Sequence, residues 1–163
     1  MLGKTYDSEV CSMARALEIV GERWSLLILR DALFAGSSRF GEFQRTLGIA
    51  TNVLSARLEG FVAAGLMERR AGADQAGAPE YVVTAKGRDL VPAIVALTQW
   101  GDRWAAPDGP PIEYQHATCG EPVTSQLHCA ECGVVDDPAE VQARPGAGMP
   151  AEFLAHRRAL RRR

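Results

Sequence analysis

Residues 39–70 read RFGEFQRTLGIATNVLSARLEGFVAAGLMERR, and this stretch decides the fold. GIA at residues 48–50 is typical of a tight turn, with Ile49 buried. Before that turn, three apolar side chains recur at helical spacing and are expected to face a core: Phe40, Phe43 and Leu47. The pattern predicts two helices joined by a tight turn and followed by a short strand.

The second of these helices is predicted to begin at Thr51, acting as its N-cap, and to end near Ala64, before Gly65. One face is apolar and should turn inward, through Leu54, Leu58, Phe61 and Val62. The opposite face carries Asn52, Ser55, Ala56 and Glu59, with Arg57 at its edge. A polar helix face of this kind suits the second helix of a helix-turn-helix.

Two helices are predicted before this stretch. Residues 8–20 place four side chains on one face, namely Met13, Ala14, Leu17 and Val20. Residues 24–35, WSLLILRDALFA, are apolar nearly all round and predict a buried helix. Ser37 or Ser38 would cap the helix that follows, and Glu42 would complete a capping box if Ser38 or Arg39 is the N-cap neighbour.

After this stretch, residues 66–70 and 80–83 predict two short strands joined by a flexible hairpin tip at residues 71–79. Thr84 is expected to cap one long helix that reaches Trp104 and bends at Pro92. A seam of apolar or small residues runs along it: Leu90, Ile94, Leu97, Gly101 and Trp104. The expected fold class is mainly α (α+β), a winged helix-turn-helix with a long C-terminal dimerisation helix.

The sequence PDGPP at residues 107–111 predicts a domain boundary. We expect a winged helix-turn-helix DNA-binding and dimerisation domain over residues 1–106 and a small zinc-ribbon-like β-hairpin module over residues 112–136. Residues 137–163 are expected to form an irregular to basic C-terminal tail. Residues 152–163 carry five Arg and one Glu, a formal charge of +4. Because the whole chain has a formal charge of −2, residues 1–151 carry −6.

Composition limits the class of protein. The chain has 163 residues, 47% of them hydrophobic, and a formal net charge of −2, so any DNA binding must depend on local basic positions. No apolar signal segment and no run long enough to cross a bilayer are present, which predicts a cytoplasmic protein without membrane contact.

Three of the four cysteines cluster late in the chain. His116-x2-Cys119-Gly and Cys129-x2-Cys132-Gly form two similar knuckles, which predicts one structural zinc held by an imidazole and three thiolates. Each glycine would permit the tight turn. His128 is a rival ligand, and the alternatives are free thiols, a Cys129–Cys132 disulfide or a redox pair.

The segments IVGERWSLLILRDALFAGSSRFGEF (19–43), GIATNVLSARLEGFVAAGLMERR (48–70) and PEYVVTAKGRDLVPAIVALTQWG (79–101), preceded by Cys11, resemble the HxlR family of bacterial transcription regulators. The resemblance covers about the first two thirds of the chain. It implies a homodimer with one winged helix per half and contacts from the first and last helices. Ser12 stands where the family often has proline, and the wing tip has little basic density.

A helix-turn-helix of this kind would place the start of its second helix in the major groove of double-stranded DNA. The residues expected to bind DNA are Arg39, Arg45, Thr51, Asn52, Ser55, Arg57, Arg69 and Arg70, with Lys86 nearby. Asn can pair with adenine and Arg with guanine. In the plainer interpretation Thr51 only caps the helix, Asn52 and Ser55 are solvated, and Arg57 pairs with Glu42 or Glu59.

Two features suggest that the protein responds to a redox or small-molecule signal. Cys11, near the start of a helix, stands where some HxlR relatives have a redox-sensing thiol, and it would otherwise be a small buried residue at a dimer seam. Trp24, Trp100 and Trp104 would line an apolar pocket for a small-molecule effector, or form part of the core.

The sequence therefore predicts a homodimeric, sequence-specific DNA-binding regulator, expected to repress transcription in response to a small-molecule or redox signal. The alternative is an adaptor that binds other proteins through the winged domain and the zinc module. An enzyme is not expected, because no nucleophile–base pair or phosphate-cradling loop is evident and the metal set is closed by four protein ligands.

Overall fold

The computed structural model describes residues 5–6, 9–72 and 77–153. The chain divides into a unit of residues 16–125 and a unit of residues 1–15 with 126–163. Residues 154–163, which hold the five arginines of residues 152–163 in the predicted tail, fall outside the described residues, as do residues 73–76 at the centre of the hairpin tip. Along the chain the elements are α1 (Ser12–Val20), α2 (Ser25–Phe34), α3 (Phe40–Leu47), α4 (Thr51–Ala63), β1 (Met67–Arg70), β2 (Glu80–Val83), α5 (Ala85–Arg88), α6 (Val91–Ala105), β3 (Leu127–Cys129), β4 (Gly133–Val135) and the 3-10 turn Pro138–Glu140.

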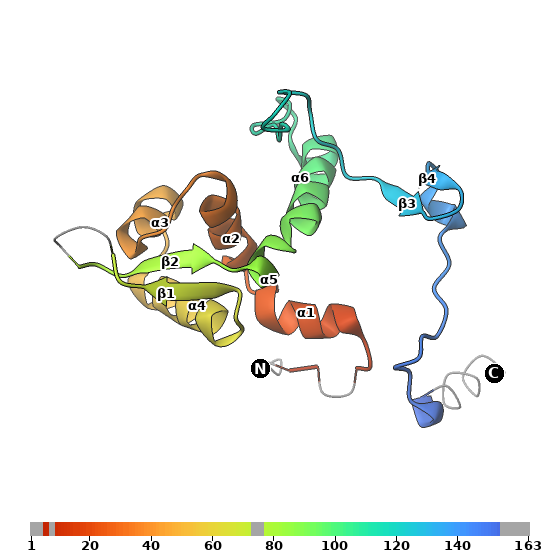
Figure 1. The fold of residues 1–163 in the computed structure, drawn as a ribbon, viewed down its shortest axis with the longest axis horizontal. Coiled ribbons are helices and arrows are strands. Elements are labelled where there is room, and N and C mark those ends of the chain that lie inside the picture. The colour runs from red at the N-terminus through yellow and green to blue at the C-terminus, as the bar shows by residue number, and fades with distance from the viewer. Residues whose placement is uncertain (1–4, 7–8, 73–76, 154–163) are drawn as a thin grey trace. The chain divides into compact units, whose positions relative to one another are not determined.

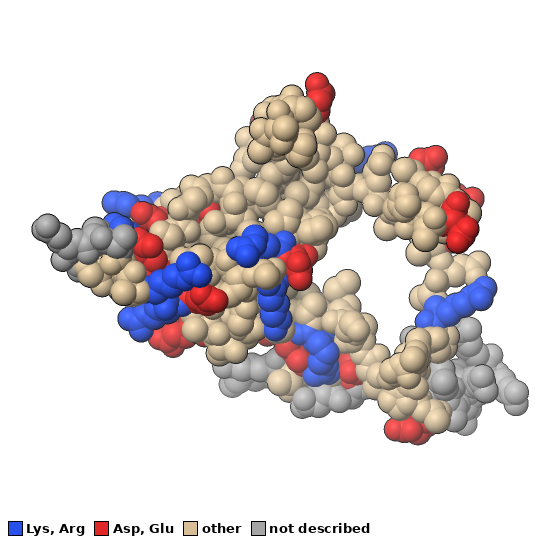
Figure 2. Space-filling view, in the orientation of Figure 1, with Lys and Arg blue, Asp and Glu red and all other residues tan. Residues whose placement is uncertain are grey.

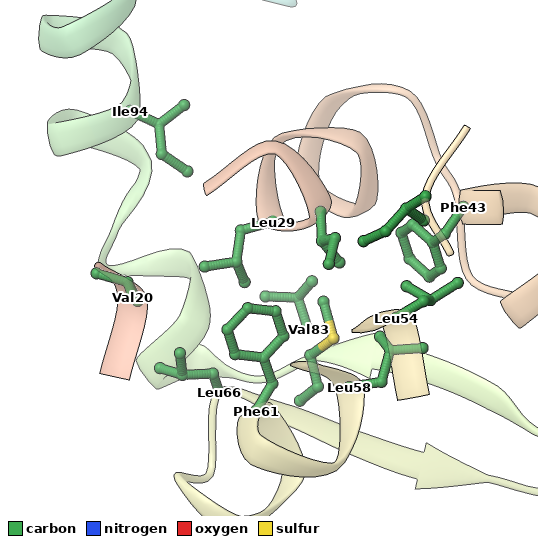
Figure 3. Packing of buried hydrophobic residues seen from close by; sticks show 12 residues of the cluster. Val20, Leu29, Phe43, Leu54, Leu58, Phe61, Leu66, Val83 and Ile94 are labelled. Carbon is green, nitrogen blue, oxygen red and sulfur yellow. The ribbon is translucent and has the colours of Figure 1, made fainter. Parts of the chain in front are cut away.

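The core of residues 16–125 lies where α2, α3 and α4 meet the two wing strands (Figures 1 and 3). Phe43, Leu54 and Leu58 are completely buried, and Phe61 is nearly so. Ile49 is buried as predicted. Val62 was expected on the same face, but it is 36% exposed because it lies at the margin of the apolar stripe.

Strands β1 and β2 form the wing, an antiparallel hairpin with Met67 opposite Val83 and Arg70 opposite Glu80. Residue 39 adds an antiparallel bridge on the other side of β2, and the amide of Tyr81 donates to the carbonyl of Ser38 over 2.7 Å. The wing is thereby attached to the start of α3.

The start of α3 depends on Glu42. Arg39 is the N-cap, and the Glu42 carboxylate accepts the backbone N–H groups of Ser38 and Arg39 over 2.8 and 2.9 Å. These two N–H groups hold the pKa of Glu42 below its usual value. Glu42 therefore completes the predicted capping box, with Arg39 as the N-cap; neither Ser37 nor Ser38 occupies that position.

The helix-turn-helix turn differs from the prediction at one residue. Gly48 ends α3 with a φ of 61°, and Ala50, not Thr51, is the N-cap of α4. Thr51 is the first helical residue, and its hydroxyl accepts the side-chain amide of Gln44 over 2.8 Å instead of a backbone N–H. This hydrogen bond joins α3 directly to the first turn of α4.

The predicted long helix after the wing is two helices. Thr84 caps α5, its hydroxyl accepting the Gly87 amide over 3.2 Å, and α6 begins anew at Val91 with Pro92 in its first turn. Proline has no N–H and its ring clashes with the carbonyl four residues earlier, so a break replaces the expected bend.

Helix α6 has one buried side and one exposed apolar side. Ile94 and Val95 are buried against the core. Leu97, Trp100 and Trp104 are exposed to 52%, 61% and 67%. The predicted seam is thus only partly internal, because Ile94 is buried while Leu97 and Trp104 face outward.

Helix α1 also exposes apolar residues. Of its predicted inward face, Ala14 and Val20 are buried, whereas Met13 is 66% and Leu17 42% exposed. None of the helices that the structure describes has both the length and the apolar character that crossing a bilayer requires.

In the second unit, β3 and β4 form a short antiparallel hairpin with Leu127 opposite Val135 and Cys129 opposite Gly133. The 3-10 turn Pro138–Glu140 follows, capped by the Asp137 carboxylate, which accepts the Ala139 amide. A β-hairpin was predicted in this region, and the structure contains one.

Candidate nucleic-acid interface

The first half of α4 offers an exposed polar surface. Thr51 and Asn52 are exposed and Ser55 is half-buried. The Ser55 hydroxyl bonds to the Glu59 carboxylate over 3.2 Å. Because Gln44 ties Thr51 to α3, the start of α4 is held in place while the Asn52 side chain stays accessible.

Arg57 lies on a different side of α4. It borders a groove together with Glu18 and Ile19 of α1, and its guanidinium is 3.7 Å from the Glu22 carboxylate. The alternative prediction that Arg57 pairs with Glu42 or Glu59 is therefore wrong. The Glu59 carboxylate bonds to Ser55, and the Glu42 carboxylate bonds to the backbone at the start of α3. Arg57 would have to leave Glu22 to reach a base.

The wing arginines also have carboxylate neighbours. Arg39 pairs with Glu80 at 3.1 Å, and Arg70 pairs with Glu68 at 2.9 Å. Arg69 is exposed and lies opposite Tyr81, next to these pairs. Figure 2 shows Lys and Arg interspersed with Asp and Glu over this part of the chain, not gathered into a patch of one sign.

The remaining predicted contact residue, Arg45, is exposed in the last turn of α3. Lys86 donates to the carbonyl of Ala64 at the C-terminal end of α4 over 2.7 Å. This bond places a cation where the carbonyls of α4 accumulate negative charge.

Sequence reasoning missed the carboxylates that pair with these arginines. Glu68 and Arg70 are two residues apart on one strand, so alternation alone could have placed them on the same side. Glu22 and Glu80 lie far in sequence from Arg57 and Arg39, and no local pattern reveals those pairs.

The predicted metal ligands form two pairs, one in each unit, and each pair is called a half-site because one zinc was predicted to bind both. In residues 16–125, the Nδ1 atom of His116 lies 3.2 Å from the Cys119 sulfur. A zinc ion bound at tetrahedral angles separates a nitrogen and a sulfur ligand by about 3.5 Å, so this pair fits a zinc edge. Gly120 follows with a φ of 76°, as the knuckle requires, and its amide donates to the His116 carbonyl.

The second half-site is at the end of the β3–β4 hairpin. Backbone N–H groups of Cys132 and Glu131, and then the Cys132 side chain, hold the pKa of the Cys129 thiol below its usual value. Gly133 has a φ of 84°. All four cysteines are free thiols in this structure. Among the described residues, no three His, Cys, Asp or Glu side chains form one metal-binding group.

The tryptophans do not line a common pocket in the described part of the chain. Trp24 packs against the core, whereas Trp100 and Trp104 are exposed. Cys11 is exposed in the single chain, at the residue before α1, and its burial at a dimer seam stays a prediction.

The arrangement of α2 to α6 around a two-stranded wing matches a known family. The HxlR-like helix-turn-helix family model matches residues 19–109, which is more than half of the chain. The chain belongs to the HxlR-like helix-turn-helix family. It is accordingly a transcriptional regulator of the helix-turn-helix type and not an enzyme.

Relatives extend the match beyond this family segment. An uncharacterized HTH-type transcriptional regulator of Mycobacterium tuberculosis, Rv3095, is 47% identical over 145 residues, covering 88% of this chain and 91% of the relative. The crystal structure of PA1607, described as a candidate transcription factor, has a TM-score of 0.76 and 36% identity over 86% of this chain and 99% of its own. The redox regulator HypR has a TM-score of 0.52 and 26% identity, over 57% of this chain and 92% of its own.

Proposed function

We propose that this HxlR-like chain is a homodimeric repressor that reads an operator in double-stranded DNA. The observation that carries the proposal is the exposed start of α4, where Asn52 is accessible and Thr51 is tied to α3. The N-terminal residues of such a helix contact base edges in the major groove.

The proposed contacts divide into two kinds. Asn52 and Arg57 would read bases, because an amide pairs bidentately with adenine and a guanidinium with guanine. Thr51, Ser55, Arg39, Arg45, Arg69 and Arg70 would position the chain on phosphates, which give affinity without sequence preference. A cytoplasmic location is proposed because the DNA target lies there.

Selection of bound duplexes from a random library tests this function. We expect a two-fold symmetric consensus, bound with an affinity that falls steeply with salt concentration. The competing function is a protein–protein adaptor. Failure to enrich any sequence at low salt would refute the proposed reading of an operator and favour the adaptor.

The homodimer is proposed from the exposed apolar sides of α6 and α1. Apolar side chains exposed on a helix surface mark candidate interaction sites. On α6 they are Leu97, Trp100 and Trp104, and on α1 Met13 and Leu17. A second copy of this chain is the proposed occupant, since one copy has one reading helix and a palindromic operator needs two.

Replacing Trp100 with serine is expected to shift the protein from dimer to monomer in sedimentation equilibrium, because aromatic anchors in an interface typically contribute 2 kcal/mol or more. The unfolding midpoint of the monomer should change little, since Trp100 is 61% exposed. Ile112→Ser is the matched control, an exposed apolar residue outside α6. Dimers of Trp100→Ser as stable as the wild type would exclude this surface.

We propose that zinc is the ligand of the two half-sites, held by His116, Cys119, Cys129 and Cys132. The spacing of His116 and Cys119 suits a tetrahedral ion, and the N–H groups at Cys129 favour the thiolate that zinc requires. When bound, zinc would supply folding energy to a segment with few buried apolar residues and would do no chemistry.

Removing the metal checks this assignment. Purified protein is expected to contain one zinc per chain, and a strong chelator should increase protease cleavage within residues 112–136 while the unfolding of the winged domain stays unchanged. Cys132→Ser should lower the zinc content, whereas Cys11→Ser, which removes a thiol elsewhere, should not. Metal-free protein that resists protease equally well would contradict the proposal.

The signal that this regulator senses is proposed to be a small molecule or a redox change. HypR is a redox regulator, and Cys11 is exposed in this chain. Cys11 is therefore the redox candidate.

A further inference from the structure

One side of α6 is covered by the chain that follows it. The side-chain amide of Gln99 donates to the carbonyl of Val123 over 2.9 Å, and its oxygen accepts the amide of Ser125 over 2.8 Å. A single side chain thus satisfies both a backbone donor and a backbone acceptor, as a neighbouring strand would. These bonds fix residues 123–125 along α6.

Tyr114 provides a second attachment of the same segment. Its hydroxyl lies 3.4 Å from the hydroxyl of Thr98 on α6, and its ring centroid is 4.6 Å from that of Phe34 at the end of α2. The amide of Val123 donates to the carbonyl of Tyr114, so the two attached parts also bond to each other. Residues 110–125 therefore form a defined layer on α6.

This layer and α6 line a surface cavity of about 410 Å³ that is open to solvent. Ligand cavities in proteins are commonly about 300–1,000 Å³ and mostly apolar, with a few polar groups that orient the ligand. The apolar part of the lining is Pro110, Ile112, Pro122 and Val123. The cavity therefore has the size and character of a site for a small molecule.

The charges around the cavity select the class of ligand. Asp102 and Glu113 contribute two carboxylates, and Arg103 also borders it. The guanidinium carbon of Arg103 lies 5.2 Å from the centroid of the Trp104 ring, a cation–π contact on the exposed side of α6. The carboxylates therefore outnumber the cations that can neutralise them within the cavity.

We propose that this cavity binds an organic cation with an apolar body, and that this cation is the small-molecule signal of the regulator. The regulatory part rests on the proposed function, whereas the binding site does not. The outer wall, residues 110–124, follows the family segment, which ends at residue 109. The outer wall therefore belongs to the part of the chain beyond the family segment, whereas α6 contributes Gln99, Asp102 and Arg103 from within it.

Calorimetric titration of the full chain with tetraphenylphosphonium tests the site, because tetraphenylborate has the same shape and the opposite charge. We expect saturable binding of one cation per chain and binding of the anion at least about tenfold weaker. No binding of the cation, or equal binding of the two ions, would overturn the assignment.

Two variants locate the bound cation. Asp102→Asn with Glu113→Gln should weaken the binding of tetraphenylphosphonium about tenfold, the usual effect of losing two partly exposed ion pairs. Glu68→Gln with Asp89→Asn removes the same charge away from the cavity and should leave the affinity unchanged. Equal behaviour of the two double variants would place the cation elsewhere. Both double variants should unfold at the same denaturant concentration as the wild type.

Operator binding is measured separately, with and without the cation. Release of DNA by tetraphenylphosphonium in the wild type, but not in Asp102→Asn with Glu113→Gln, is the expected result. Cation binding by a chain that binds no DNA would refute the proposed function and leave the cavity assignment intact. Cation binding that leaves operator affinity unchanged would refute the signalling role.

Discussion

Replacing Asn52 with alanine should lower the affinity for the selected operator about tenfold to a hundredfold, because a bidentate amide–base contact contributes about 1–3 kcal/mol. Alanine is the best helix former, so α4 should persist. The affinity for random DNA should not change, since phosphate contacts remain. Fluorescence anisotropy with operator and scrambled duplexes measures both quantities.

Arg45→Ala is the matched control for a contact without sequence preference. Arg45 is exposed at the end of α3, where a phosphate contact is proposed. Its removal should weaken operator and scrambled DNA alike and reduce the slope of log K against log salt by about 0.9. If Asn52→Ala also weakened both duplexes equally, Asn52 would not be a base-reading residue.

Gly87→Ala should destabilise the winged domain by about 1–3 kcal/mol, the usual effect of forcing an extra methyl group into a packed site. A Cβ atom at this position would lie 2.4 Å from the carbonyl oxygen of Leu66 and 2.6 Å from a methyl carbon of Val83. Neither neighbour can move freely, since Leu66 precedes β1 and Val83 ends β2. Urea denaturation followed by circular dichroism gives the difference.

Gly60→Ala is the matched control for this prediction. Gly60 lies inside α4, and a Cβ there has no neighbour within 4 Å. The same substitution should therefore stabilise the protein by about 0.5–1 kcal/mol, because alanine loses less backbone entropy in a helix. Two changes of the same sign would show that the close approach at Gly87 does not control stability.

The sequence predicted the helix-turn-helix and the wing because local periodicity determines them. Phe43, Leu54 and Leu58 recur at helical spacing, and all three are buried. The prediction failed where two local preferences compete. Pro92 breaks the helix instead of bending it, and Thr51 bonds to Gln44 instead of capping α4.

The candidate site was less predictable, since its side chains meet across long sequence separations. Arg39 and Glu80 are 41 residues apart, and Arg57 pairs with Glu22 from before α2. The exposure of Trp100 and Trp104 was also missed, because an exposed apolar residue on a helix has the same sequence pattern as one that fills a core. Gln99 and Tyr114 carry no local signal of the layer that they attach.

In the free protein Arg39, Arg57 and Arg70 each pair with a carboxylate. In the proposed complex Arg39 and Arg70 would exchange this carboxylate for a phosphate, and Arg57 would leave it for a base. The net gain in attraction to an arbitrary stretch of duplex would then be small. A chain with a net charge of −2 should therefore spend little time on the many competing genomic sites. Selectivity for the operator would then arise from weak binding to all other DNA as much as from strong contacts at the operator.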